Sequence, residues 1–276
     1  MADHQELELP PEPTPRKDPN FGAIILAALI LVGIVLYAFK AEDLMRQNAL
    51  REAYTEGNQE EVLRLLTEMH EDAPDDPVPL SLRADILIRM GKPEAALDDH
   101  DAAVELAQDA FADKPEELAR IYLGRAMTQL ALRKTEAGIG DMETAIEKAP
   151  GILVAKNNLA WTLCTHPDTS VHDADRAITL ATEVVTIQKR THSGSLDTLA
   201  AAYARKGNFK KAIEVQQEAI SVAIDPDEIL VLDKHMDLFL DKKPVVEDPV
   251  DTYSLGTPPA TQPDPQPEDP LSTDEA

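Results

Sequence analysis

The sequence predicts an all-α protein in which a series of helical hairpins follows one transmembrane helix. Three observations support this fold class. Apolar residues recur every three to four positions through residues 41–243, the period of one face of an α-helix. Helix-breaking residues fall at regular intervals in the same region, and Gly57 and Gly91 are 34 residues apart. An uninterrupted apolar run precedes the periodic region.

The composition excludes several classes of function. The chain has 276 residues, of which 51 are acidic and 26 basic, giving a formal charge of −25. Because nucleic-acid binding depends on Lys and Arg neutralising phosphates, we expect no nucleic-acid partner. Cys164 is the only cysteine, which excludes an intrachain disulfide and a multi-cysteine metal cage. Phosphate-binding GxxxxGK, zinc-protease HExxH and nucleophile-elbow GxSxG motifs are absent from the sequence, so we expect no cofactor.

The N-terminal part predicts an anchor in the cell membrane. Residues 1–20 form an acidic, proline-rich tail, and residues 21–39 carry no charge. As a helix, residues 21–39 would be about 28 Å long, which matches the hydrocarbon thickness of a lipid bilayer. A buried core helix seldom runs this long without a polar side. A cleavable signal peptide would need a basic start and a small-residue cleavage site, which Lys40 spoils. We therefore expect a single-pass span.

The orientation of this span is poorly marked, because basic residues flank it almost equally. Arg16 and Lys17 precede it, and Lys40, Arg46 and Arg51 follow it. We place the repeat region on the exported, periplasmic side, because long domains translocate largely regardless of charge.

Small residues recur at fixed distances from each hairpin turn. Gly207 permits the backbone of a tight turn between helices, with Ala200 before it and Ala212 after it. Small side chains at these spacings let two antiparallel helices approach closely, so we expect Leu199, Ala200 and Ala212 to be buried there. The same pattern surrounds two further turn positions and comprises Ala84, Ala96 and Ala103 around Gly91, and Ala126, Gly138 and Ala145 around Arg133.

These residues resemble the tetratricopeptide repeat (TPR) family, whose unit is a helix–turn–helix of 34 residues. The resemblance implies a right-handed superhelix of about five hairpins and a capping helix. The expected units are residues 43–76, 77–110, 119–152, 153–191 and 193–226, with the cap at 227–240. Alternatively, the segment 227–240 binds a partner through its apolar side. The motifs NNLAWTLCTHPD and SLDTLAAAYARKGNF look more specifically like repeats of bacterial, planctomycete-type proteins, which implies a bacterial origin.

The C-terminal segment, residues 244–276, holds eight acidic residues and eight prolines without one basic residue. Such a composition cannot bury a core, so we expect a disordered, solvated tail.

The favoured function is a non-catalytic, membrane-anchored TPR scaffold that mediates protein–protein interaction or complex assembly. The family resemblance implies a groove lined by the first helix of each hairpin, which suits an extended peptide or a partner helix of another protein. The matching positions are Asp85, Arg89, Arg120, Met127, Asn157, Trp161, Asp197 and Arg205. Asn157 precedes Trp161 by one helical turn, so both can face one ligand. The alternative is that Trp161 packs in the core between hairpins.

A second function class rests on the loop from Cys164 to His172. Thiolate, imidazole and carboxylate groups occur together there, and they are ligand types for zinc or parts of a nucleophilic pair. The residues concerned are Cys164, His166, Asp168, His172 and Asp173. The simpler interpretation is a helix-terminating loop with polar caps, because Asp168 and Asp173 are good turn and N-cap residues. We therefore expect no metal and no enzyme activity, and keep the enzyme or metal-binding protein as the alternative.

Overall fold

The computed structural model describes residues 44–247. The predicted tail 1–20, the predicted membrane span 21–39 and the tail beyond residue 247 lie outside the described residues. Within residues 44–247, no helix combines the length and apolar character needed to cross a membrane. The described part of the chain contains helices and no strands, which confirms the all-α class.

The chain divides into two compact units, residues 1–58 and residues 59–276. In the first unit, residues 44–55 are helical. Gly57 ends this helix in the left-handed region at φ +70°, and the Asn58 N–H donates to the Ala53 carbonyl over 2.9 Å. This pairing of a left-handed glycine with a backward hydrogen bond is a common helix C-cap.

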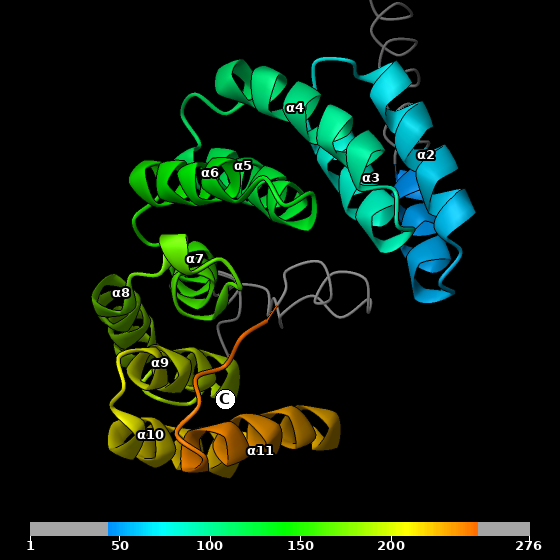
Figure 1. The fold of residues 1–276 in the computed structure, drawn as a ribbon. Helices are drawn as coiled ribbons and strands as arrows, with labels where there is room; N and C mark the ends of the chain where they lie inside the picture. The colour runs from blue at the N-terminus through cyan, green and yellow to red at the C-terminus, as the bar shows by residue number, and fades with distance from the viewer. Residues whose placement is uncertain (1–43, 248–276) are drawn as a thin grey trace, which may run out of the picture. The chain divides into compact units, whose positions relative to one another are not determined.

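The second unit is a succession of α-helices that pack on their neighbours in chain order (Figure 1). The helices α3 and α4, α5 and α6, α7 and α8, and α9 and α10 pair as hairpins. A 3-10 turn, η1, lies between α7 and α8. The bounds are α2 Gln59–Asp72, α3 Val78–Arg89, α4 Pro93–Ala110, α5 Pro115–Ala131, α6 Thr135–Lys148, α7 Leu153–Thr165, η1 Thr169–Val171, α8 Ala174–Ile187, α9 Ser193–Arg205, α10 Phe209–Val222 and α11 Pro226–Leu240.

Small residues hold the paired helices close together, as the spacing predicts. Leu199 is 3% exposed, and Ala200 and Ala212 are 0% exposed. The alanines predicted around Gly91 and Arg133 are equally buried. A Cβ atom on Gly138 would lie 3.0 Å from both the Ala126 carbonyl oxygen and the Leu130 Cγ atom, so α5 and α6 approach as closely as glycine allows.

The helix bounds differ from the expected units at one place. The helix α5 begins at Pro115, before the expected boundary at 119, because the residues after α4 extend the next helix instead of forming a long linker. Between α7 and α8, residues 166–173 form the helix-terminating loop of the simpler interpretation. The expected capping segment forms α11, which packs on α10 and buries Leu232 and Phe239.

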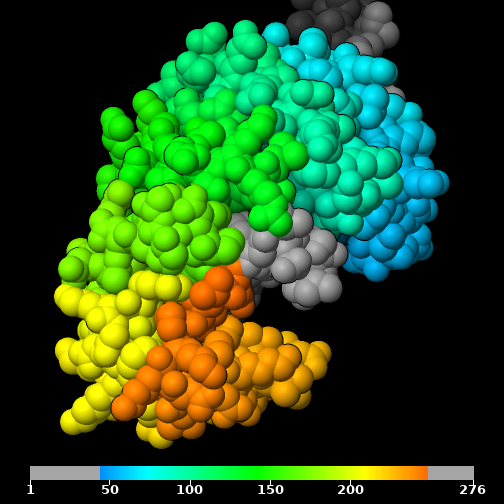
Figure 2. Space-filling view, in the orientation of Figure 1, coloured from blue at the N-terminus to red at the C-terminus, as the bar shows by residue number. Residues whose placement is uncertain are grey.

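The first residues of the predicted C-terminal tail contact the helices. Val245 is 2% exposed and belongs to the same apolar core as α7 and α9. Figure 2 shows these orange residues lying against the green and yellow helices of the preceding hairpins.

Candidate protein-binding surface

The first helices of the hairpins carry residues at equivalent positions, and we call the surface of α3 with α5 and of α7 with α9 at these positions the first-helix face. Asp85, Met127 and Trp161 each stand four residues before the last residue of α3, α5 and α7. Asn157 and Asp197 each stand eight residues before the end of α7 and α9. The helices α3 and α5 contact each other, as do α7 and α9, so these positions form a ladder along each of those pairs.

On the α3–α5 part of this face, Asp85 and Met127 are half-buried, and Arg89 and Arg120 are exposed. The Asp85 side chain is 47% exposed, and desolvation by the surrounding protein raises its pKa to about 6 against an opposing effect of Arg89. The Met127 sulfur accepts a hydrogen bond from Asn158 over 3.6 Å. These side chains offer both charge and apolar surface to a ligand.

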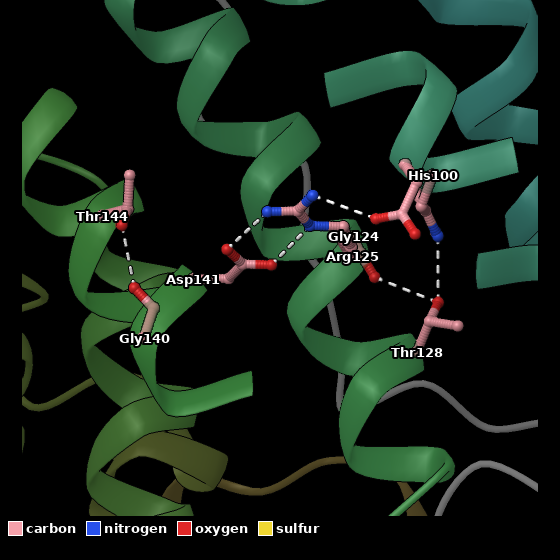
Figure 3. Close-up of polar contacts among 8 residues, drawn as sticks. His100, Gly124, Arg125, Thr128, Gly140, Asp141 and Thr144 are labelled. Atoms are coloured by element: carbon pink, nitrogen blue, oxygen red, sulfur yellow. Dashed lines mark hydrogen bonds and ion pairs between the residues drawn. The ribbon is translucent and has the colours of Figure 1, made fainter. Parts of the chain in front are cut away.

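Behind Asp85 lies a buried histidine that sequence reasoning did not single out. His100 is 0% exposed, and its Nδ1 atom lies 2.9 Å from the Thr128 hydroxyl (Figure 3). Because that hydroxyl donates to the Gly124 carbonyl, it accepts a hydrogen bond from Nδ1–H. Burial lowers the pKa of His100 to about 4, so the ring is neutral. A Cβ atom at Gly124 would lie 2.6 Å from His100 Nε2, so the ring requires glycine there.

On the α7–α9 part of the face, Trp161 is half-buried and packs against the apolar core. Its ring centroid lies 5.8 Å from that of His235 on α11. The core and the His235 ring therefore contact part of the indole. Asn157 is half-buried, and its Oδ1 atom has no hydrogen-bond partner among the described residues. Because this oxygen is itself buried, it is one of the few polar atoms in the described part of the chain that lack a partner, and it offers no contact to a docked chain.

The other two predicted groove residues are engaged within the chain. Asp197 is 6% exposed, and its two carboxylate oxygens lie 2.9 and 3.0 Å from His235 Nδ1. Arg205 donates from Nε to the Cys164 carbonyl and from Nη2, over 2.7 Å, to the Val245 carbonyl. Both residues thus hold other parts of the chain against the first-helix face.

These contacts belong to a short C-terminal segment, residues 244–247, which we call the strap. It follows α11 without regular secondary structure. The Glu247 N–H donates to the Thr165 carbonyl over 3.0 Å, and the Glu247 carboxylate lies 3.4 Å from His235 Nε2. Burial opposes the charge on His235, but hydrogen bonds to Asp197 and Glu247 outweigh burial and raise its pKa to about 10. His235 is therefore charged at neutral pH.

The strap meets a helix end that needs partners. The last carbonyls of a helix have no partner within the helix. In α7, the carbonyl of Leu163 accepts from the Asp173 N–H, that of Cys164 from Arg205 and that of Thr165 from the strap. The cationic Arg205 also suits the negative end of the α7 dipole.

The loop of the alternative function carries no open metal or catalytic set. Cys164 is 1% exposed, its thiol donates to the Trp161 carbonyl, and burial raises its pKa.

The other candidate ligands of this loop are engaged within the chain. His166 Nε2 lies 3.1 Å from the Thr135 hydroxyl, and His166 Nδ1 accepts a hydrogen bond from the Asp168 N–H. His172 Nε2 bonds to the His166 carbonyl. Asp168 and Asp173 cap η1 and α8. No group of three metal-ligating side chains occurs within residues 44–247. The alternative is not favoured.

Two arginines link helices across hairpins in a way the sequence analysis missed. Arg125 pairs with Asp141 through two hydrogen bonds of 2.7 and 2.9 Å and also contacts Asp101 on α4 at 3.0 Å (Figure 3). Arg83 forms the same bidentate pair with Asp99 and donates a further hydrogen bond to the Thr67 hydroxyl on α2. Each arginine therefore joins the second helix of its own hairpin to the helix that precedes the hairpin.

The C-terminal hairpin matches a known family. Residues 193–224, which span α9 and α10, match the family described as tetratricopeptide repeat. The chain carries a tetratricopeptide repeat. No curated protein matches the chain at a significant level.

Several solved structures resemble the chain in fold. MamA 41-end from Desulfovibrio magneticus RS-1 has a TM-score of 0.52 at 18% identity, covering 64% of this chain and 93% of that chain. A tetratricopeptide repeat protein from Parabacteroides merdae has a TM-score of 0.53 at 14% identity, covering 72% of each chain. The C-terminal part of a TPR repeat-containing protein from Cytophaga hutchinsonii has a TM-score of 0.52 at 11% identity, covering 70% of this chain and 71% of that chain. At these identities the likeness shows the fold alone.

Proposed function

We propose that the protein is a non-catalytic scaffold, anchored in a bacterial cell membrane by residues 21–39, which holds another protein through its first-helix face. In this proposal the repeat region is a right-handed superhelix of about five hairpins, and it stands on the exported side. Proteins built from stacked hairpins characteristically bind extended chains or helices along such faces. A membrane anchor also raises the local concentration of whatever the scaffold holds.

The observation that carries this proposal is the α3–α5 part of the first-helix face. Asp85 and Met127 occupy equivalent positions there, remain half-buried and lie beside the exposed Arg89 and Arg120. A mixed apolar and charged surface of this kind is typical of protein interfaces, in which a few anchoring residues dominate the binding energy.

Crosslinking in native membranes, read by mass spectrometry, tests the binding face. Met127→Lys should remove or weaken the partner crosslinks, because it places a charge among the contacts of an interface. Ile187→Lys is the matched control, because Ile187 is 54% exposed at the end of α8, a second helix. Identical crosslinks in wild type and Met127→Lys, with helicity and melting unchanged, would count against this face.

Membrane fractionation and carbonate extraction test the anchor. The full chain should stay in the membrane fraction, and a chain that begins at Ala41 should be released. Recovery of native protein that lacks its first forty residues would show cleavage and would remove the anchor from the proposal.

A further inference from the structure

The strap contacts the α7–α9 part of the first-helix face as a short extended peptide would. The Val245 carbonyl accepts from Arg205, and the Glu247 N–H donates to the Thr165 carbonyl. In an extended chain, the carbonyl of one residue and the N–H two positions later point to the same side. Both bonds use only the backbone of the strap, so any extended chain of suitable side chains can make them.

The side chains of the strap alternate in the same register. Val245 is 2% exposed, Val246 is 56% exposed, and the Glu247 side chain is 33% exposed beside His235. Alternate residues of an extended chain point to opposite sides. The site thus receives an apolar side chain and, two positions later, a carboxylate, while the residue between them points away.

The groups that receive the strap are fixed by other parts of the chain. Arg205 Nε is bound to the Cys164 carbonyl, and His235 Nδ1 is bound to both oxygens of Asp197. Neither anchoring contact involves the strap. A site whose donors are held in place before binding loses less entropy on binding, which favours affinity.

We propose that this site, formed by Thr165, Arg205 and His235, binds an extended segment of a partner protein in which an apolar residue precedes a carboxylate by two positions. The strap is its intramolecular competitor: it keeps the site closed until such a partner segment displaces it. This inference rests on the proposed scaffold function and adds the chemistry of one ligand and its regulation. Tethering gives the strap an effective concentration of about millimolar, so a weak partner segment does not displace it.

Fluorescence anisotropy with a labelled peptide of residues 241–251 tests the site on the full-length chain in mild detergent. The double variant Val245→Ser with Glu247→Gln releases the strap, and it should bind the peptide at least tenfold more tightly than wild type does. Val246→Ser is the matched control and should bind as wild type, because Val246 points to solvent. A peptide with Gln in place of Glu247 should bind the released chain at least threefold more weakly.

Two results would overturn the inference: equal peptide affinity in wild type and the released chain, or no binding to a released chain that keeps its helicity. If the double variant loses helicity, the single variant Glu247→Gln replaces it in the test, because it removes only a partly exposed carboxylate. This variant should bind the peptide at least threefold more tightly than wild type does. An unchanged affinity would show that the strap does not compete for the site. Failure here leaves the Met127 crosslinking result intact, so the two proposals fail separately.

Discussion

At the scale of single residues, His235 connects three parts of the chain. It stands on α11, bonds to Asp197 on α9 and faces Glu247 in the strap. Its pKa is raised to about 10 in the folded chain, against about 6.5 in an unfolded one. Folding therefore favours its protonated form. This contribution to stability is fully present below about pH 6.5 and is lost as the pH rises through about 10.

The first prediction concerns this pH dependence. Between pH 7 and pH 10.5, the free energy of unfolding of wild type should fall, by up to a few kcal/mol at about 1.4 kcal/mol per pKa unit. His235→Gln should show a smaller fall, measured by urea unfolding at several pH values. His192→Gln is the control, because it removes a histidine whose ring faces the Ser195 hydroxyl. Equal slopes for wild type and His235→Gln would contradict the assignment.

At the scale of elements, two hairpins use an ion pair where another uses apolar packing. Arg125 and Asp141 stand eight residues before and eight residues after the left-handed Arg133, as Arg83 and Asp99 do around Gly91. Around Gly207, the same two positions are Leu199 and Val215, which are 3% and 8% exposed. The hairpin geometry therefore accepts either kind of contact at this register.

The second prediction compares these two solutions. Arg125→Ala leaves Asp141, which is 7% exposed, without its partner and should cost about 3 kcal/mol of unfolding free energy. The double variant Arg125→Leu with Asp141→Val copies the last hairpin and should lie within about 1 kcal/mol of wild type, because apolar pairs often replace buried ion pairs without loss. Thermal and urea unfolding measure both. A double variant less stable than Arg125→Ala would show that the two registers are not equivalent.

The hairpin contacts could be predicted because each depends on residues at a fixed distance from a turn. The burial of Ala200 and Ala212 can be predicted from their small size and their spacing alone. The arginine–aspartate pairs do not, because charged residues stand at such distances on many helices and only the packed structure selects a pair. The histidines of the loop after α7 resemble ligands by residue type, yet backbone groups and a hydroxyl bind three of their four ring nitrogens.

The strap could not be predicted for a different reason. It lies in a segment rich in proline and acidic residues, whose composition favours solvation. The strap binds where α7 ends before an irregular loop, because the last carbonyls of α7 require hydrogen-bond donors. A donor that lies about eighty residues further along the chain leaves no periodic signal in the sequence. The predicted groove residues Asp197 and Arg205 were selected by register, and their engagement with α11 and the strap appears only in three dimensions.

At the scale of the whole molecule, the strap makes a long-range contact with a helix that is not its neighbour in chain order, and stacked hairpins do not require such a contact. Each hairpin otherwise contacts its neighbours in chain order. The strap returns past α9 and bonds to the end of α7.

The third prediction separates the strap from the residues that follow it. A chain that ends after Glu247 should melt at the same temperature as the full chain. A chain that ends after Lys243 should lose about 2 kcal/mol or more of unfolding free energy, because it removes the buried Val245 side chain from the apolar core together with two hydrogen bonds. Circular dichroism melting measures both. Equal melting of the two shortened chains would show that the strap contributes nothing to stability.

Because the strap binds the C-terminal end of α7, it also determines the order in which the repeats unfold locally. In an array held only by nearest neighbours, terminal hairpins fray one at a time, and their amide hydrogens exchange with solvent sooner than those in the middle. Here α10 and α11 cannot leave α9 without freeing the α7 carbonyls. The amides from α7 to α10 should therefore exchange together, as one cooperative block, while those of α2 to α4 exchange earlier and in sequence. Slow exchange would mark the C-terminal end of the array, opposite to the fraying expected of a chain terminus.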